Sequence, residues 1–145
     1  MARHLIVAHQ TAGSIELVDR VLELAERDPK AEFVLLVPAT PTGHLLHWEE
    51  GEARQLATLR AREASEALRT AGVEVVAARV GSHSPLEAVA DELSMQPDYA
   101  GIVVSTFPPG LSRWLRVDLP NQLRRRFRLP VEHVVAVLSD VRAAS

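Results

Sequence analysis

The chain has 145 residues, of which 47% are hydrophobic and 24% charged, and its formal net charge is −3. These values are typical of one globular domain with a single sizeable core, and the net charge excludes a global attraction to nucleic acid or to an acidic membrane. The absence of cysteine excludes disulfides, thiolate metal sites and a cysteine nucleophile. We find neither a signal peptide nor an apolar run that spans a bilayer, and we therefore expect a cytoplasmic protein without a membrane partner.

The first two strands are indicated by short, continuous apolar runs, Leu5–Ala8 and Phe33–Val37, of the kind that lie buried in parallel sheets. A helix is predicted between them. Ser14 is a good N-cap, apolar residues recur at helical spacing from Leu17 to Ala25, and Asp28-Pro29 stops the helix. This part of the chain therefore predicts a strand–helix–strand unit.

A second unit follows. A long amphipathic helix is predicted from about Trp48 to Ala71, and Gly72 ends it. The partly alternating run Val73–Val80 predicts a strand nearer the edge of the sheet. Ser84-Pro85-Leu86-Glu87 is a capping box with proline at the first helical position, and Gln96-Pro97 ends the helix that it starts.

The last part of the chain contains two more strands and a divided helical segment. Tyr99–Val104 predicts a buried fourth strand, which leads into a corner containing Pro108-Pro109-Gly110. Large apolar residues then recur every four positions from Leu111 to Phe127, and Pro120 should divide this segment into two helices. Val131–Leu138 predicts the fifth strand.

Strands that alternate with helices predict an α/β protein with three layers, in which an open five-stranded parallel sheet carries helices on both faces. We expect one domain over residues 1–139 and a C-terminal tail over residues 140–145. In such a sheet, ligands bind at the carboxyl ends of the strands. The corner from Val103 to Asp118, where the fourth strand turns into a basic helix, is therefore the stretch on which function should depend.

The segment from Arg113 to Arg128 carries the main charge asymmetry. It holds six arginines against Asp118 alone, a local charge of +5 that leaves −8 for the rest of the chain. No aromatic platform and no reading helix accompanies these arginines, so nucleic acid is not an expected partner. We interpret the arginines of residues 124–128 as a solvated helix face. For Arg113 and Arg116, a solvated face and an anion-binding role are equally consistent with the sequence.

Five further side chains each have two interpretations. His44 and His47 have the spacing of a metal-binding pair, but no carboxylate–histidine set accompanies them, so we expect surface histidines and no metal. His9 and His83 follow the first and third strands, where each either contacts a ligand or bonds to backbone. Trp114 favours a core or dimer contact over stacking on a base.

The whole pattern resembles a universal stress protein domain, over nearly the full length of the chain. The stretches that carry the resemblance are the opening strand Leu5–Ala8, the long helix before the third strand, the turn formed by Gly81, Pro85 and Ala88, the strand Asp98–Val104 and the pair Pro130-Val131. The last three resemble the family's Gly-x-Pro-type turn, its "ADLIVVG" strand and its "CPVLVV" ending. The resemblance implies a Rossmann-like fold of the adenine nucleotide alpha hydrolase-like type, with strand order 3-2-1-4-5 and a switch point between strands one and four.

The resemblance also implies a nucleotide site at that switch point. In nucleotide-binding members, an acidic residue after strand one contacts the nucleoside, and a Gly-x2-Gly-x9-Gly-Ser/Thr loop after strand four wraps the phosphates, because glycine lets backbone N–H groups approach them. Here Gln10 stands at the acidic position. A direct overlay puts Ser105, Pro108 and Asp118 at the three glycines. A one-residue shift puts Val117 at the last glycine and Asp118 at the Ser/Thr.

Known catalytic motifs are absent from the sequence. The chain has no Gly-x-Ser-x-Gly elbow and no Gly-Lys-Ser/Thr phosphate loop. Related nucleotide-fold enzymes carry His-x-Gly-His after strand one, which His9-Gln10-Thr11-Ala12 does not match, and a Ser-Gly-Gly loop of the ATP-pyrophosphatase kind is missing as well. We therefore predict no catalytic residues and a protein that is not an enzyme.

The departures at the phosphate loop decide between the hypotheses. Pro108 and Pro109 supply no N–H donors, and Asp118 would place a carboxylate near a triphosphate. The first hypothesis is therefore a universal stress protein-like regulatory or binding module whose degenerate nucleotide site does not bind ATP in the family manner. Members of the family commonly dimerise through the last strand, so the resemblance implies a homodimer through Val131–Leu138.

The second hypothesis is an adenine nucleotide-binding stress protein that holds ATP or AMP through altered phosphate contacts. A third is a hydrolase or transferase with an unrecognised site. No cofactor other than this nucleotide is predicted. The candidate ligand-binding residues are Ala8, His9, Gln10, Gly13, Pro38, Gly81, Ser105, Thr106, Gly110, Arg113 and Asp118.

Overall fold

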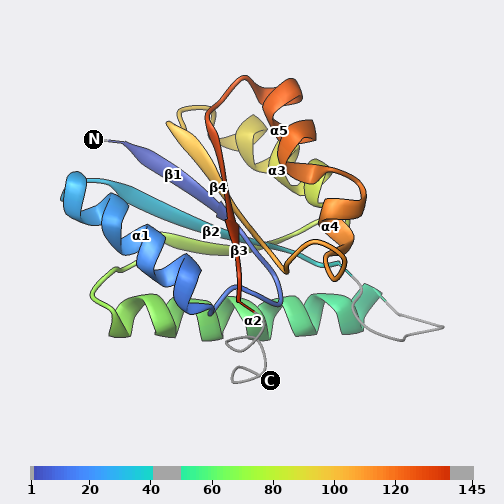
Figure 1. Ribbon diagram of the computed structural model, residues 1–145, viewed down its shortest axis with the longest axis horizontal. Helices are drawn as coiled ribbons and strands as arrows, with labels where there is room; N and C mark the ends of the chain where they lie inside the picture. The colour runs from blue at the N-terminus through green and yellow to red at the C-terminus, as the bar shows by residue number, and fades with distance from the viewer. Residues whose placement is uncertain (1, 41–49, 138–145) are drawn as a thin grey trace.

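The computed structural model describes residues 2–40 and 50–137, in which strands and helices alternate as the sequence predicts (Figure 1). The strands are β1 (Arg3–Val7), β2 (Glu32–Pro38), β3 (Ala77–Gly81), β4 (Gly101–Thr106) and β5 (Val131–Val135). The helices are α1 (Ile15–Arg27), α2 (Glu50–Thr70), α3 (Pro85–Met95), α4 (Arg113–Arg116) and α5 (Leu119–Phe127). The histidine pair His44 and His47 and the predicted tail, residues 140–145, lie outside the described residues.

The five strands form one parallel sheet in the order β3-β2-β1-β4-β5. Helices α1 and α2 cover one face of the sheet, and α3, α4 and α5 cover the other (Figure 1). The predicted three-layer α/β fold and its strand order are confirmed. Among the described helices, none combines the length and the apolar character that crossing a membrane requires.

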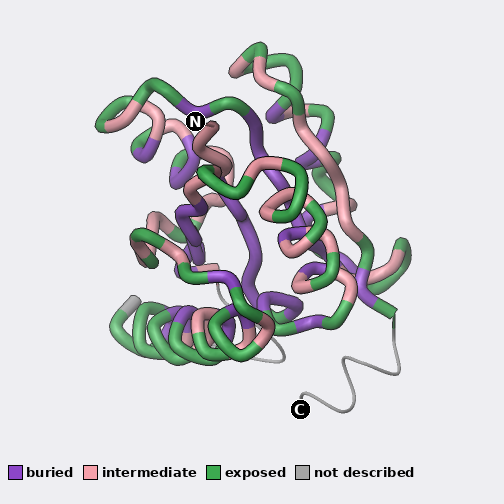
Figure 2. Tube along the Cα trace, turned by 90° about the vertical axis from the view of Figure 1, so that its left-hand side faces the viewer, coloured by how far each residue is buried: buried purple, intermediate pink, exposed green. Residues whose placement is uncertain are grey.

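Two cores lie on the two faces of the sheet, because successive strand side chains point in opposite directions. Along β1, Leu5 and Val7 join the core beneath α3 and α5, whereas Ile6 joins the core beneath α1 and α2. Figure 2 shows the strands buried in the middle of the molecule and the outward sides of the helices exposed. The continuous apolar runs therefore belong to strands that are covered on both faces, as predicted.

The helix ends follow the local signals in the sequence. The Ser14 hydroxyl accepts a hydrogen bond from the Leu17 N–H at 3.3 Å, and the Ser84 hydroxyl accepts one from the Glu87 N–H at 3.4 Å. These bonds cap the beginnings of α1 and α3. Gly72 follows α2 with a φ of +100°, a conformation that favours glycine. Each of these ends is set by a few neighbouring residues.

Pro120 divides the last helical segment as predicted, with α4 before it and α5 around it. The predicted apolar stripe is only partly right. Leu119 and Leu123 are buried against the sheet, but Leu111 is 54% exposed and precedes α4. Trp114 is buried in the same core as α5, which confirms its interpretation as a core residue.

The predicted start of the third strand is wrong. β3 begins at Ala77 rather than at Val73, because the Val73 N–H still donates to the Leu68 carbonyl at the end of α2. Pairing with β2 begins only when Ala77 lies opposite Val34. The hydrophobic pattern from residue 73 therefore includes the turn that brings the chain back to the sheet.

The fourth and fifth strands also differ from their predicted bounds. β4 begins at Gly101 and continues to Thr106, beyond the predicted end at Val104, because its last residue pairs with Val135 of β5. β5 in turn ends at Val135, before the predicted end at residue 138. Two residues predicted to lie on the ligand-binding corner, 105 and 106, are thus part of the sheet.

Candidate functional site

The carboxyl ends of the strands carry the loops on which most predicted ligand-binding residues lie (Figure 1). After β1, Ala8 is buried, whereas Gln10 and Gly13 are exposed. Gln10 is the residue that the family resemblance places against a nucleoside. The Gln10 side chain makes no hydrogen bond to any described residue, and the residue is exposed to solvent.

A pair of hydroxyls joins the ends of β1 and β4. Thr11 Oγ1 and Ser105 Oγ lie 2.6 Å apart, and both residues are buried. β1 and β4 are neighbours at the switch point of the sheet. One hydroxyl therefore donates its proton to the other, and the pair cannot present both protons to a ligand while this bond is made. Thr11 is absent from the predicted residues, and its position in the loop after strand one is the only sequence signal for it.

Thr106, the last residue of β4, is engaged in the same manner. Its hydroxyl donates to the Phe107 carbonyl at 2.8 Å and lies 2.7 Å from Nε2 of His133 on β5. Because the hydroxyl has one proton, which the Phe107 carbonyl receives, the His133 Nε2–H donates to Thr106. His133 was also not predicted as a site residue, since only the strand register, with Val104 opposite His133, brings it here.

His9 is buried just after β1 and has no hydrogen-bond partner among the described residues. The residue is 5% exposed, and within the described part of the chain neither Nδ1 nor Nε2 has a partner. Burial, and after it the positive charge of Arg60 on α2, lower the pKa of His9 to about 4. The imidazole is therefore neutral at pH 7 and has one donor and one acceptor unused. The predicted alternative, a bond from His9 to backbone, is not found among the described residues.

Gly81 ends β3 at a point of close packing. A Cβ atom at this position would lie 2.7 Å from the Cβ of Ala88 on α3 and 3.1 Å from Leu36 Cδ1. Pro38, also a predicted site residue, is buried and lies opposite Gly81 in the register of β2 and β3. The packing of α3 against the sheet by itself explains glycine at position 81.

The loop between β4 and α4 turns at Gly110, where a φ of +92° favours glycine. The Leu111 N–H donates to the Pro108 carbonyl at 3.1 Å. The Ser112 hydroxyl accepts from the Leu115 N–H at 3.1 Å and caps α4. Since the two prolines of this loop have no N–H, the loop supplies few backbone donors to a phosphate.

The two charged residues predicted for the site, Arg113 and Asp118, are exposed; Arg113 begins α4, and Asp118 lies two residues after this helix. Asp118 occupies the N-cap position of α5 with a left-handed φ of 54°, but its side chain makes no capping bond. Its carboxylate oxygens accept hydrogen bonds from Asn121 Nδ2 at 3.1 and 3.2 Å. Asp118 therefore belongs to the junction between α4 and α5.

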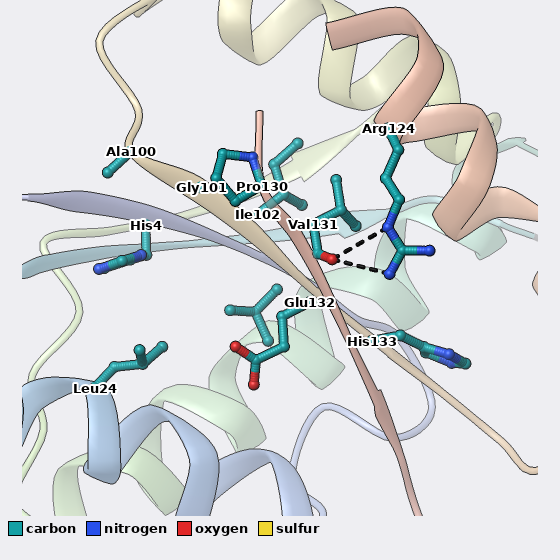
Figure 3. A pocket seen from close by; sticks show the side chains of 11 residues that line it. His4, Leu24, Ala100, Gly101, Ile102, Arg124, Pro130, Val131, Glu132 and His133 are labelled. Carbon is teal, nitrogen blue, oxygen red and sulfur yellow. Dashed lines mark hydrogen bonds between the residues drawn. The ribbon is translucent and has the colours of Figure 1, made fainter. Parts of the chain in front are cut away.

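A groove of about 610 Å³ lies at the first residues of β4 and β5 and extends to His4 of β1 (Figure 3). Arg124 of α5 lies on one side of it and donates to the Val131 carbonyl from Nε at 3.3 Å and from Nη2 at 2.9 Å. On the other side lie His4 and Glu132, whose carboxylate pairs with Arg20 of α1. Local sequence patterns do not indicate this groove, because its walls come from several separate elements.

No protein-family model matches the chain, and no curated protein matches its sequence. Solved structures of universal stress proteins do match. One in complex with cAMP aligns with a TM-score of 0.62 and 20% identity, over 93% of this chain and 98% of its own. The universal stress protein from Archaeoglobus fulgidus aligns with a TM-score of 0.63 and 15% identity, over 92% of this chain and 93% of its own. A universal stress protein family protein from Arabidopsis thaliana with AMP bound aligns with a TM-score of 0.57 and 14% identity, over 94% of each chain.

These likenesses extend over at least 92% of each chain, although the sequence identities do not exceed 20%. They therefore concern the arrangement of strands and helices and not individual site residues. They agree with the sheet order that the sequence resemblance implies. At the level of the fold the resemblance is confirmed: the chain has the Rossmann-like fold of the universal stress proteins.

Proposed function

We propose that the chain is a divergent universal stress protein that acts as a binding or regulatory module and does not bind ATP in the manner of the nucleotide-binding members. The observation that carries the proposal is the bond of 2.6 Å between the buried hydroxyls of Thr11 and Ser105, which joins β1 to β4 at the switch point. A phosphate that accepted hydrogen bonds from both hydroxyls would have to break this bond between two buried groups, which costs free energy.

The neighbouring loop supports the same proposal. A triphosphate is held by converging N–H groups and by cations. In this loop, Pro108 and Pro109 have no N–H to donate to a phosphate. Gly110, with its positive φ, forms the turn that follows them. At the start of the site, Gln10 is neutral and exposed where the family places an acidic residue. Both halves of the family's nucleotide site are therefore altered.

A second candidate function is the binding of an adenine nucleotide with a single phosphate. Universal stress proteins with this fold have been solved with cAMP and with AMP. A monophosphate requires fewer phosphate contacts than ATP, and a purine base offers both donors and acceptors. His9 favours this candidate, because its neutral imidazole is buried with both nitrogens unpartnered among the described residues.

We further propose that the module is a homodimer that pairs through β5. β5 lies at an edge of the sheet, where one row of backbone N–H and C=O groups has no strand partner in the described chain. Such an edge is a template for another strand, and a second copy of the chain can close it by two-fold symmetry.

Calorimetric titration of the ligand-stripped protein with ATP, AMP and cAMP, with and without magnesium, tests the ligand proposals. We expect no saturable heat with ATP at millimolar concentration, and saturable binding of ATP in the micromolar range would overturn the first proposal. Binding of AMP or cAMP that His9→Leu abolishes and the exposed control His83→Gln retains would establish the second candidate. Sizing with light scattering tests the dimer, and a monomer at micromolar concentration would contradict it.

A further inference from the structure

Arg60 interrupts the apolar stripe by which α2 packs against the sheet. Ala57 and Ala64 are fully buried, and Arg60 lies three positions after the first and four before the second. This spacing places the three side chains on one face of the helix. A charged residue therefore stands where the stripe calls for an apolar one, and its side chain is only 25% exposed.

The guanidinium of Arg60 is only partly paired. Its Nε is buried and has no hydrogen-bond partner in the described part of the chain. Nη1 lies 3.5 Å from a carboxylate oxygen of Glu63, whose side chain is 47% exposed. An ion pair this long and this open to water compensates a charge weakly. One N–H of a charged group is thus left unused inside the protein.

His9 lies close enough to Arg60 to respond to its charge. That charge is the second cause, after burial, of the lowered pKa of His9. Both ring nitrogens of His9 are buried and lack a hydrogen-bond partner among the described residues. In a neutral imidazole either nitrogen can carry the proton. Two unused donors, one from the loop after β1 and one from α2, therefore lie near each other.

The neighbours of these two side chains along the chain are alanines of one core, namely Ala8, Ala12, Ala57 and Ala61. Their methyl groups offer no hydrogen bond to either donor. A buried polar group without a partner costs free energy, so most such groups are hydrogen-bonded and each exception requires an explanation. The guanidinium charge repels a cation, whereas an anion can accept hydrogen bonds from both groups.

We infer that His9 and Arg60 form a binding site for a phosphate group between the loop after β1 and α2. An oxyanion there accepts from the Arg60 Nε–H and from an imidazole N–H, and hydrogen bonds between charged groups are among the stronger ones. The donors come from the sheet side and from the helix that covers it. A phosphate offers acceptor oxygens in both directions, whereas a carboxylate has only two oxygens in one plane.

This site is distinct from the ligand proposals above. The resemblance places phosphates at the loop after β4, whereas the inferred site lies on the face of the sheet that α2 covers and needs no contact from residues 105–118. In the second candidate function, His9 faces a purine base instead of a phosphate. Free phosphate and the phosphate of a nucleotide share the chemistry of the inferred site, and the test separates them.

The NMR signal of the His9 ring reports on the site. The protein has six histidines, and the ring signal that disappears in His9→Leu is that of His9. Titration with inorganic phosphate at pH 7, in a buffer free of other oxyanions, should shift this signal until the site is saturated. A His9 signal that stays unmoved at tens of millimolar phosphate would overturn the inference.

Arg60→Met tests the second donor, because it keeps the apolar part of the side chain and removes the charge. It should weaken phosphate binding by about ten-fold or more, as expected for a lost hydrogen bond from a charged group. Without phosphate it should be at least as stable as the natural protein, since an apolar side chain replaces a weakly paired charge. Should Arg60→Met fail to fold, Arg60→Gln tests the same loss of charge.

Arg62→Met is the matched control, since Arg62 is exposed on the same helix. It should leave phosphate binding unchanged. Unchanged binding in the Arg60 variants, or equal weakening in Arg60→Met and Arg62→Met, would overturn the inference, because the effect would then be absent or one of net charge.

Adenosine and AMP separate the sources of the phosphate. Adenosine has no phosphate and should leave the His9 signal unmoved, and a saturable shift with adenosine would overturn the inference in favour of a base at His9. Tighter binding of AMP than of inorganic phosphate at the His9 signal would identify a nucleotide as the source. Weaker binding of AMP would identify free phosphate.

Discussion

At the amino ends of the strands, charged side chains are paired: Arg3 binds Glu32 at 3.1 Å, and the buried Glu92 accepts a hydrogen bond from the Tyr99 hydroxyl at 2.7 Å. At the carboxyl ends, the buried polar groups are neutral. Hydroxyls there bond one another, and His9 is buried with no partner among the described residues. The two ends of the sheet thus differ in their polar groups: charged and paired at the amino ends, neutral and buried at the carboxyl ends.

This difference separates a structural end of the sheet from a ligand-facing end. A buried polar group without a partner costs stability, so most are hydrogen-bonded, and the exceptions gather at functional sites. The amino end satisfies its charges and holds α3 to the sheet. At the carboxyl end, His9 finds no partner for its donor or its acceptor among the described residues, and it lies beside the loops where this fold binds ligands.

The largest expected effect comes from removing the buried carboxylate at the amino end. Glu92 is 1% exposed, and its Oε1 lies 3.0 Å from Nε of Arg79. Burial of Tyr99 and, as the second cause, its hydrogen bond to Glu92 raise the pKa of the Tyr99 hydroxyl, so the phenol stays protonated and donates. Glu92→Ala should lower the free energy of unfolding by about 3 kcal/mol, because the Tyr99 hydroxyl loses its hydrogen-bond acceptor and Arg79 loses its ion-pair partner. Urea denaturation measures this, with the exposed Asp91→Ala as control; equal losses in the two variants would contradict the structural role of Glu92.

The second prediction concerns pH at the carboxyl end. The pKa of His9 is about 4 in the folded protein and 6.5 in the unfolded chain. Between these values the unfolded chain binds a proton that the folded protein does not, so the free energy of unfolding should fall as the pH falls from 6.5 to about 4. The loss from His9 should be about 3 kcal/mol, and it is complete below that window.

Urea denaturation at several pH values measures this effect. His9→Leu should flatten the dependence, whereas the exposed control His83→Gln should retain it. Burial also lowers the pKa of His4 and of His133, so a smaller slope should remain in His9→Leu. Identical profiles for the natural protein and His9→Leu would mean that His9 is not held neutral, and the contrast between the two ends of the sheet would lose its main support.

The third prediction sharpens the comparison within the carboxyl end. Gly81→Ala should destabilise the protein by about 2 kcal/mol, because the new Cβ overlaps Ala88 on α3. Gly13→Ala, on the loop after β1, is the matched control, since a Cβ there meets nothing within 4 Å. Thermal unfolding distinguishes them. A Gly81→Ala protein as stable as Gly13→Ala would show that α3 can shift away from the sheet, and Gly81 would then need another explanation.

The smallest effect concerns the bond that closes the switch point. Thr11→Val and Ser105→Ala should each cost about 1 kcal/mol, because each leaves the other hydroxyl buried without a partner. The double variant should cost less than the sum of the two losses. A double-mutant cycle in urea measures this coupling. Additive losses would mean that the two hydroxyls do not depend on each other, and the main support for a closed nucleotide site would be gone.

Sequence patterns predicted the elements but not the buried polar contacts. The caps at Ser14 and Ser84, and the division at Pro120, are local and act as predicted. Glu92 lies among apolar residues of α3, and nothing local indicates that it is buried. Its burial depends on Arg79 of β3 and on Tyr99 in the segment before β4.

The candidate site shows the same division. Of its predicted residues, Ser105 and Thr106 are the last two of β4, and no local pattern indicated the partners of their side chains, Thr11 and His133. Thr11 and Ser105 are 94 positions apart in the chain. Asp118 was predicted for the site from an overlay of loop lengths, whereas the structure uses it at the junction of two helices.

By itself, the sequence determined the kind and order of the elements and, through the family resemblance, the order of the strands. Apolar run length, helical spacing, prolines and caps act within one turn or one strand, so they can be read locally. Only the tertiary structure decided which hydroxyls meet at the switch point, that His9 is left without a partner among the described residues, and that Arg60 of α2 lies near it. These contacts depend on strand register and on how helices pack across the sheet, which couple residues far apart in the chain.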